Sequence, residues 1–326
     1  MQNRLLFITG RGRSGTWLLQ TILDAHPEMV IAPESIFLIN LKNKYHKIGS
    51  WDKKVIDNFI NDLKSDQKIV HWWSLDFGLL ERSLIETSDL NYAKACMLVY
   101  KQYSISQGNA SSVAYLGDKN PEYSLKIRDV LEIYPDAKII ILVRDPRDNI
   151  SSYLNVNFDL NNPIALAARW NFYIKRILSD SEDHPKNIRI FQYEKLLEQP
   201  ASVLQQMCDF LEITYTDDLL SFYENPKNVF EWNKQIGSAL NKENAYKWKR
   251  NKTSSWIPKV SKLCSHYIEI LNYEQAEQKD LTLLDRLNYL YGIFISRLEM
   301  LYYTLPVFLK NLILKIYRRL TKTFSN

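Results

Sequence analysis

A glycine-rich turn near the start of the chain constrains the fold more than any other feature. Before it, residues 4–9 form an apolar run that predicts a buried strand, and after it residues 17–25 carry apolar side chains at helical spacing. The turn consists of Gly10-Arg11-Gly12-Arg13-Ser14-Gly15-Thr16. A strand, a glycine loop and a helix in this order are typical of a phosphate site, because the loop N–H groups and the positive end of the helix attract an anion.

The loop has the glycine spacing of an ATP-cleaving P-loop but lacks its lysine. Gly10 and Gly15 match that spacing, whereas Thr16 stands where the lysine is expected. Arg13 supplies a cation inside the loop, and the Thr16 hydroxyl could bind the same phosphate. The sequence therefore predicts a loop that binds a phosphate but differs from the loops that cleave nucleoside triphosphates. A plain glycine turn without a ligand is the alternative.

A second anion site is predicted after the apolar run at residues 138–143. Five consecutive aliphatic residues in this run predict a central strand buried on both faces. Arg144 directly follows it, at the edge where open α/β sheets bind ligands, and Ser152 comes eight residues later. We expect Arg144 and Ser152 to converge on one phosphate. We expect Arg147 and Asp148, in the same segment, to form a local ion-pair cluster.

Strand and helix patterns alternate along the chain, which predicts an α/β fold with a P-loop-like, mostly parallel sheet flanked by helices. Further short strands are expected at residues 29–31 and 188–191, and residues 115–121 are expected to form the end of a strand and a turn. Segments of mixed polarity predict a helical insertion at about 40–112. We expect one α/β domain at 1–280 and a basic amphipathic helical tail at 281–326.

The excess positive charge belongs to this tail. Residues 281–326 hold seven basic and two acidic residues, so they account for the whole formal net charge of +5. Within it, an apolar stripe along 305–320 with basic residues on the other side predicts an amphipathic helix, with Pro306 in its first turn. Such a helix could make peripheral membrane contact through residues 305–322, or pack on its own domain or on a second subunit.

Composition excludes several classes of protein. The three cysteines are widely spaced and the five histidines lack ligand spacing, so we expect packed, reduced thiols and no metal site. No charged segment precedes a long apolar one at the N-terminus, and no apolar window of 18 residues is free of charge. We therefore expect no signal peptide and no transmembrane helix, and a cytoplasmic protein that could be peripheral at the membrane.

The motifs, taken in order, resemble those of the superfamily of sulfotransferases that use 3′-phosphoadenosine-5′-phosphosulfate (PAPS), in its bacterial-type and tyrosylprotein-sulfotransferase-like branch. The resemblance covers residues 4–250. The first loop resembles the family's 5′-phosphosulfate loop, and residues 144–152 resemble its 3′-phosphate motif. Other matching segments are His26-Pro27, Pro33-Glu34-Ser35, Gly117-Asp118-Lys119-Asn120-Pro121-Glu122-Tyr123, Phe191-Gln192-Tyr193-Glu194-Lys195-Leu196, and Ile236-Gly237 with Tyr246-Lys247-Trp248.

The resemblance implies transfer of a sulfuryl group from PAPS to an acceptor hydroxyl, with 3′-phosphoadenosine-5′-phosphate (PAP) as product and no metal. The implied PAPS-binding residues are Arg11, Gly12, Arg13, Ser14, Gly15, Thr16, Trp17, Arg144, Ser152 and Tyr193. Glu34 would be the general base, Arg13 would stabilise the leaving phosphate, and Lys119 would bind the sulfuryl oxygens. Alternatively, Glu34 is a helix N-terminal carboxylate near a capping Ser35, and Lys119 pairs with Asp118.

The acceptor is left open by the sequence. A glycan, a glycolipid, a tyrosine and a small alcohol all fit, and family analogy favours a carbohydrate or glycolipid. His71-Trp72-Trp73 could line the acceptor cleft or form a buried aromatic cluster. No nucleic-acid partner is expected, and the oligomeric state stays open. The competing functions are a nucleotide-dependent kinase with a degenerate P-loop and a non-catalytic, membrane-associated nucleotide-binding protein.

Overall fold

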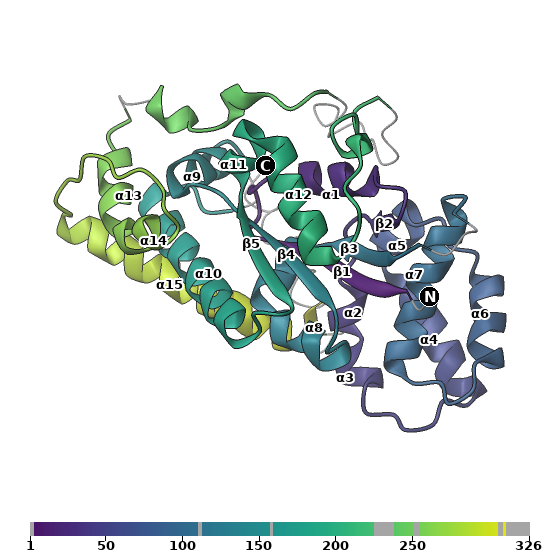
Figure 1. Cartoon of the computed structure of the whole chain (residues 1–326). Coiled ribbons are helices and arrows are strands. Elements are labelled where there is room, and N and C mark those ends of the chain that lie inside the picture. Colours follow the sequence, from purple (N-terminus) through teal and green to yellow (C-terminus); the bar gives the residue numbers. More distant parts are fainter. Residues whose placement is uncertain are drawn as a thin grey trace, which may run out of the picture.

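The computed structural model describes residues 3–109, 113–156, 159–224, 238–250, 254–305 and 309–310. It confirms the predicted α/β class. Five parallel strands form one sheet in the order β2-β3-β1-β4-β5 (Figure 1). The strands are β1 (Arg4–Thr9), β2 (Met29–Ala32), β3 (Tyr115–Lys119), β4 (Lys138–Val143) and β5 (Ile188–Gln192).

The central strands are the aliphatic runs seen in the sequence. Strand β1 lies between β3 and β4, and residues 5–9 and 139–143 are all buried. In the parallel register, Ile8 of β1 lies beside Lys119 of β3 and Ile140 of β4. The carboxyl ends of these strands therefore meet at one edge of the sheet, where an α/β fold places its ligand.

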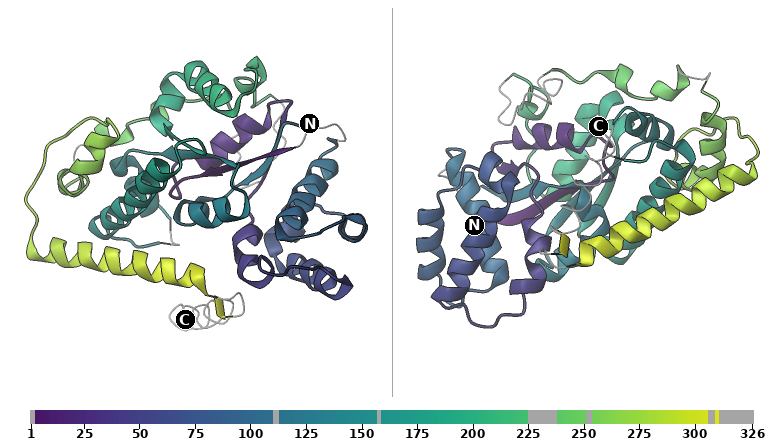
Figure 2. Two further views of the ribbon diagram at one scale, coloured as in Figure 1. Left: turned by 60° about the horizontal axis from the view of Figure 1, so that its bottom comes forward. Right: turned by 180° about the vertical axis from the view of Figure 1, so that it is seen from behind.

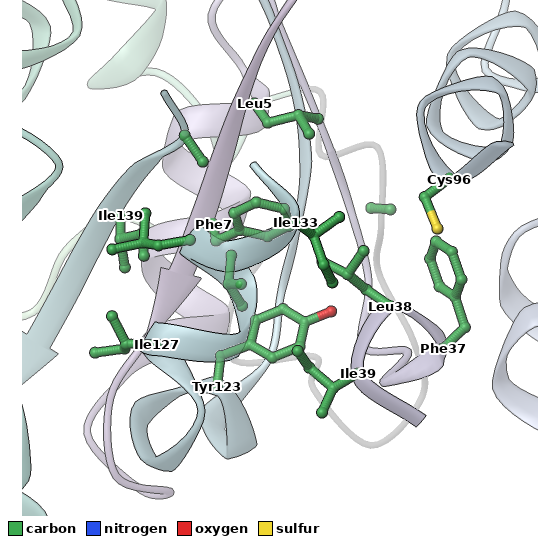
Figure 3. Close-up of a cluster of buried hydrophobic side chains, with 14 of the residues drawn as sticks. Leu5, Phe7, Phe37, Leu38, Ile39, Cys96, Tyr123, Ile127, Ile133 and Ile139 are labelled. Carbon is green, nitrogen blue, oxygen red and sulfur yellow. The ribbon is translucent and has the colours of Figure 1, made fainter. Parts of the chain in front are cut away.

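Helices cover both faces of the sheet (Figure 1). One face packs against α1 (Thr16–Asp24), α11 (Tyr193–Glu198) and α12 (Pro200–Leu211). The other packs against η1 (Pro121–Leu125), α8 (Ile127–Ile133), α9 (Pro146–Leu154) and α10 (Pro163–Asp183). Figure 3 shows this second core, in which the Phe7 and Tyr123 rings meet edge to face with centroids 5.6 Å apart.

The chain between β2 and β3 is helical, as the sequence predicts. Its helices are α2 (Phe37–Asn40), α3 (Lys42–Tyr45), α4 (Lys53–Ser65), α5 (Gln67–Trp72), α6 (Phe77–Glu86) and α7 (Tyr92–Ser106). Aspartate or asparagine side chains cap the N-termini of α4 to α7. Trp73 lies in the core of this part, with its ring centroid 5.6 Å from that of Phe37, so it does not line a cleft.

The C-terminal part begins with short elements and ends in a long helix. The elements after α12 are η2 (Asp217–Leu219), η4 (Lys242–Asn244), η5 (Lys247–Lys249), α13 (Ile257–Leu263), α14 (Ser265–Ile270) and α15 (Leu283–Thr304). Thr282 and Asp285 form a capping box that starts α15. Figures 1 and 2 show α15 running along α10 on the outside of the molecule.

Helix α15 packs on the α/β body through small and polar side chains. Asn171 of α10 donates a hydrogen bond to the Tyr289 hydroxyl (2.9 Å), and Arg169 pairs with Glu299 (2.8 Å). The predicted boundary at residue 280 stays a prediction. The predicted amphipathic stripe at 305–322 lies outside the described residues, apart from positions 305, 309 and 310. Within the described ranges, no helix has both the length and the apolar character needed to cross a bilayer.

Gly292 lies where α15 crosses α10 most closely, and its replacement tests this contact. A Cβ atom there would lie 2.8 Å from Ala168 Cβ and would collide with the Ala165 carbonyl. We expect Gly292→Val to lower the free energy of unfolding by about 1–3 kcal/mol, because the two helices must separate. Urea denaturation measures this. Gly49→Val, at a glycine with open space around it, should stay within about 0.5 kcal/mol of the parent; equal losses in both variants would contradict the packing argument.

Candidate active site

The loop between β1 and α1 makes turns that require glycine. Gly10 and Gly15 have φ angles of 149° and 93°, and Arg13 has 64°. A Cβ atom at Gly15 would lie 2.5 Å from the Tyr193 ring, and one at Gly10 would collide with the Leu142 carbonyl. The loop therefore lies directly against the ends of β4 and β5. The loop leads into α1, which begins at Thr16. The N–H groups in the first turn of a helix have no partners within the helix.

Asn149 on α9 fixes the shape of this loop. Its side-chain amide donates to the Gly12 carbonyl (3.0 Å) and to Ser14 Oγ (3.3 Å), while its oxygen accepts from Arg11. The Arg11 guanidinium is buried and lies 4.2 Å from the centroid of the Tyr153 ring. Arg11 thus binds protein groups beneath the loop. Sequence reasoning missed Asn149 and Tyr153, although both belong to the second predicted motif or its helix.

Arg13, Arg144, Ser152 and Tyr193 come together at the sheet edge. Arg13 Nε donates to Ser152 Oγ (3.0 Å), and Arg144 Nη1 donates to the Arg13 carbonyl (3.2 Å). The Arg144 guanidinium lies 4.7 Å from the centroid of the Tyr193 ring. The two predicted phosphate motifs are therefore adjacent. Ser152 contacts the first motif through Arg13, and its expected convergence with Arg144 on one phosphate stays a prediction.

The buried Lys119 and the partly buried Glu34 form an ion pair beside the loop. Lys119 Nζ donates to Glu34 Oε1 (2.6 Å) and lies 3.5 Å from the centroid of the Trp17 ring, and Lys68 Nζ from α5 lies 3.1 Å from Glu34 Oε2. Burial raises the pKa of Glu34, but the two ammonium groups outweigh burial and hold it below the usual value. Burial lowers the pKa of Lys119, and the Glu34 carboxylate opposes this shift.

The alternative prediction that Lys119 pairs with Asp118 is wrong. Asp118 points to the opposite face of β3, where it accepts hydrogen bonds from the hydroxyls of Tyr100 (3.1 Å) and Tyr123 (2.9 Å). Alternation of side chains along a strand separates the two neighbours. Ser35 Oγ accepts a hydrogen bond from the Phe37 N–H (3.3 Å), but the N-cap residue of α2 is Ile36, so Ser35 is not the cap. Glu34 binds Lys119 and Lys68.

A cavity of about 770 Å³ opens beside the loop and the Glu34–Lys119 pair. Its lining comes from the loop, η1, α9, α10 and α15, and consists of Gly12, Arg13, Thr16, Trp17, Glu34, Asn120, Pro121, Glu122, Tyr153, Asp159, Arg169, Tyr173, Ile295, Leu298, Glu299 and Tyr302. Burial is the main cause that raises the pKa of the Glu122 carboxyl to about 7. Glu122 was not singled out from the sequence, although it lies in the motif that contains Lys119.

The first turn of α9 holds the segment around residues 247–248 in place. The Asp148 carboxylate accepts from the backbone N–H groups of Lys247 (2.9 Å) and Trp248 (2.7 Å). Arg147 pairs with Asp145 (2.6 Å) and lies 3.7 Å from the centroid of the Trp248 ring. The expected local ion-pair cluster is therefore correct for Arg147 and wrong for Asp148. The matching segment Ile236-Gly237 belongs to residues 225–237, which lie outside the described residues.

The described residues contain no group of three or more His, Cys, Asp or Glu side chains that could hold a metal ion. Cys96, Cys208 and Cys264 are buried free thiols, as the sequence predicts.

Comparison with known proteins gives the family. The model of the sulfotransferase family matches residues 6–217, which include both phosphate motifs, Glu34 and Lys119. This chain belongs to the sulfotransferase family. The resemblance found in the sequence is thereby confirmed, and the chain is an enzyme of the transferase class.

Curated relatives and solved structures agree with this assignment. A putative protein-tyrosine sulfotransferase of Caenorhabditis briggsae is 22% identical over 85% of this sulfotransferase and 91% of that protein. Protein-tyrosine sulfotransferase A of Caenorhabditis elegans is 25% identical over 74% of this chain and 60% of that protein. The sulfotransferase domain of the Synechococcus PCC 7002 olefin synthase superposes with a TM-score of 0.60 at 21% identity, over 85% of this chain and 98% of that domain. The fold is thus that of a sulfotransferase.

Asp118, beneath the site, should make the stability of this sulfotransferase depend on pH. Burial raises its pKa from 3.8 to about 8. The folded protein therefore binds more protons than the unfolded chain between these values, so this contribution to stability is complete at acidic pH and is lost as pH rises through 8. In the parent protein, this carboxyl should lower the free energy of unfolding by up to about 1.4 kcal/mol per pH unit, the limit for one proton. We expect Asp118→Asn to abolish this part of the pH dependence.

Urea denaturation from pH 5 to 8 measures this difference. The exposed Asp218→Asn serves as the control and should run parallel to the parent protein. If Asp118→Asn also ran parallel, the carboxyl of Asp118 would not be the titrating group.

Proposed function

We propose that this sulfotransferase moves the sulfuryl group of PAPS to an acceptor hydroxyl and releases PAP. The observation that carries the proposal is the common cavity wall of Arg13, Thr16 and Glu34, with Lys119 bound to Glu34 at 2.6 Å. This wall combines groups for a leaving phosphate, a sulfuryl group and an acceptor proton. The matched family supports the reaction type.

The donor would lie along the sheet edge. In the proposal, the N–H groups of residues 11–17 and the side chains of Arg13 and Thr16, which line the cavity, bind the 5′-phosphosulfate, as helix N-termini and loop amides bind other phosphates. Arg144 and Ser152 bind the 3′-phosphate, and Tyr193 lies at the adenine side. Arg13 stabilises the charge that builds on the 5′-phosphate as it leaves. The proposal assigns this stabilisation to side-chain cations and uses no metal.

The acceptor step needs a base on the cavity side. In the proposal, the acceptor oxygen forms a bond to sulfur, the sulfur–oxygen bond to the 5′-phosphate breaks, and the acceptor proton passes to Glu34. The lowered pKa of Glu34 keeps this carboxylate ionised at neutral pH, which is the form that a base requires. Lys119, now bound to Glu34, would also bind the sulfuryl oxygens and so orient the two reactants.

The acceptor class rests on the cavity and on the relatives. Aromatic side chains of Trp17, Tyr153, Tyr173 and Tyr302 line the cavity and suit a ring-bearing acceptor, either a phenol or a sugar. The curated relatives carry the name protein-tyrosine sulfotransferase. We therefore place a tyrosyl phenol first among the acceptors to test, ahead of the carbohydrate or glycolipid favoured by analogy alone. Cytoplasmic location stays a prediction.

Binding of PAP tests the donor site. At about 100 times its Kd, PAP should stabilise the folded protein by about 2.7 kcal/mol without added metal, and Arg144→Ala should abolish most of this shift. Thermal unfolding with PAP, ATP or ADP, each with and without Mg²⁺, measures the effect. Arg82→Ala, an exposed arginine on the insertion, is the matched control and should keep the full shift. Stabilisation by ATP and Mg²⁺ alone would favour the kinase alternative.

Glu34→Gln tests the base once a panel of tyrosyl peptides, oligosaccharides and alcohols has given an acceptor. We expect kcat to fall by about 10²–10⁴, because the acceptor proton loses its base, while the thermal shift with PAP persists. Glu122→Gln, in the same cavity wall, is the comparison and should keep kcat within about tenfold. The opposite ranking of the two variants would move the role of base to Glu122.

A further inference from the structure

The outer face of α15 carries a continuous apolar stripe. Eight of the twelve exposed large apolar side chains among the described residues lie on this one helix, with 44–74% of their surface exposed. We call this set the outer stripe: Leu283, Leu284, Leu287, Leu290, Tyr291, Phe294, Leu298 and Leu301. The other four exposed apolar side chains are scattered over α5, α6, α7 and α14. A patch of this extent on one helix indicates a binding surface.

The opposite face of α15 packs on the α/β body. Asp285 and Ser296 are buried, and Gly292 packs against Ala165 of α10. The outer stripe recurs every three or four residues on the side of α15 opposite Gly292, so it faces away from α10 as one surface. The helix therefore has one face fixed on the α/β body and one apolar face that the described part of the chain leaves exposed.

The charged side chains of α15 that border the outer stripe are both positive. Arg286 and Arg297 are exposed and lie eleven residues apart, three helical turns, along one border of the stripe. The two acidic residues of α15 are engaged elsewhere, Asp285 with Lys259 and Glu299 with Arg169. After residue 304, the sequence holds five basic and no acidic residues. An apolar face bordered by cations is characteristic of helices that lie in the interface of an anionic bilayer.

We propose that the outer stripe of α15 binds the surface of an anionic lipid bilayer, with the helix axis in the membrane plane. Helix α15 lies on the membrane and does not cross it, because its other face stays packed on α10. The cationic border favours an anionic lipid surface over a second copy of the chain, since a second copy would present the same cations to the first. This surface differs from the sequence-predicted contact at 305–322, which comes later in the chain.

The arrangement would also orient the cavity. Leu298 belongs both to the outer stripe and to the lining of the cavity, and Ile295 and Tyr302 of the same helix line it too. A bilayer bound at the outer stripe would therefore lie beside the cavity. This consequence rests on the proposed function: an acceptor hydroxyl on a membrane-borne molecule could enter without leaving the lipid surface.

Vesicle flotation of the full chain tests the proposal. We expect binding to vesicles of equal parts phosphatidylcholine and phosphatidylglycerol, and weaker binding to phosphatidylcholine alone. Leu290→Ser with Phe294→Ser should lower the partition coefficient about tenfold or more, because two apolar side chains no longer enter the interface. Arg286→Gln with Arg297→Gln should lower it about tenfold on the anionic vesicles only.

The matched control replaces two exposed isoleucines of the insertion. Ile85→Ser with Ile105→Ser removes similar exposed apolar surface, 52% and 50% exposed, and should leave flotation unchanged. Equal flotation of the parent and the Leu290/Phe294 variant would overturn the proposal. A parent that is a dimer by light scattering, becomes a monomer in that variant and never floats would also overturn it, in favour of a second copy. Flotation is measured without nucleotide, so it does not depend on the PAP result.

Discussion

The buried lysine at the end of β3 sets a strict condition on the site. Lys119 has no exposed surface, and a buried ammonium group is costly unless a carboxylate and an aromatic face compensate for lost water. Glu34 and Trp17 do so from two different segments, the loop after β2 and the first turn of α1. The ion pair therefore joins three neighbouring strand ends into one wall. Its loss would leave the buried lysine without its carboxylate partner, and because Glu34 is what opposes the lowering of the Lys119 pKa by burial, the amine would lose its proton more readily.

The same edge gains its second set of contacts from α9. The Asn149 side-chain amide donates to the Gly12 carbonyl, and the Asp148 carboxylate accepts from the backbone N–H groups of residues 247 and 248, so one helical turn fixes the phosphate loop and a segment far along the chain. Neighbouring residues on a helix point in different directions, which lets adjacent side chains serve two segments that are far apart in sequence. The loop of the proposed donor site is thus ordered by hydrogen bonds within the protein, which would limit the ordering cost of binding.

Short-range patterns predicted the parallel sheet, the phosphate loop and the second motif, because each depends on a few consecutive residues. The apolar runs at 4–9 and 138–143 and the glycines at 10 and 15 carry most of that information. The partners across the site were not predictable in this way. Lys68 approaches Glu34 from the insertion, and no spacing in the sequence links them. Asp148 was interpreted as part of an ion-pair cluster because its true partners are backbone groups about a hundred residues away, which have no signature in the sequence.

Helix α15, the described part of the tail, contributes to more than one surface of the molecule. The basic residues that distinguish 281–326 lie mostly after residue 304, whereas residues 283–304 combine a buried polar face, an exposed apolar face and a share of the cavity wall. Arg169 joins these roles: it pairs with Asp159 at 2.9 Å and with Glu299 at 2.8 Å, and all three side chains line the cavity. Helix α15 therefore contributes to the cavity wall through the same ion pairs that fix it to α10. A surface bound to the outer stripe would lie against the helix that lines the proposed acceptor site.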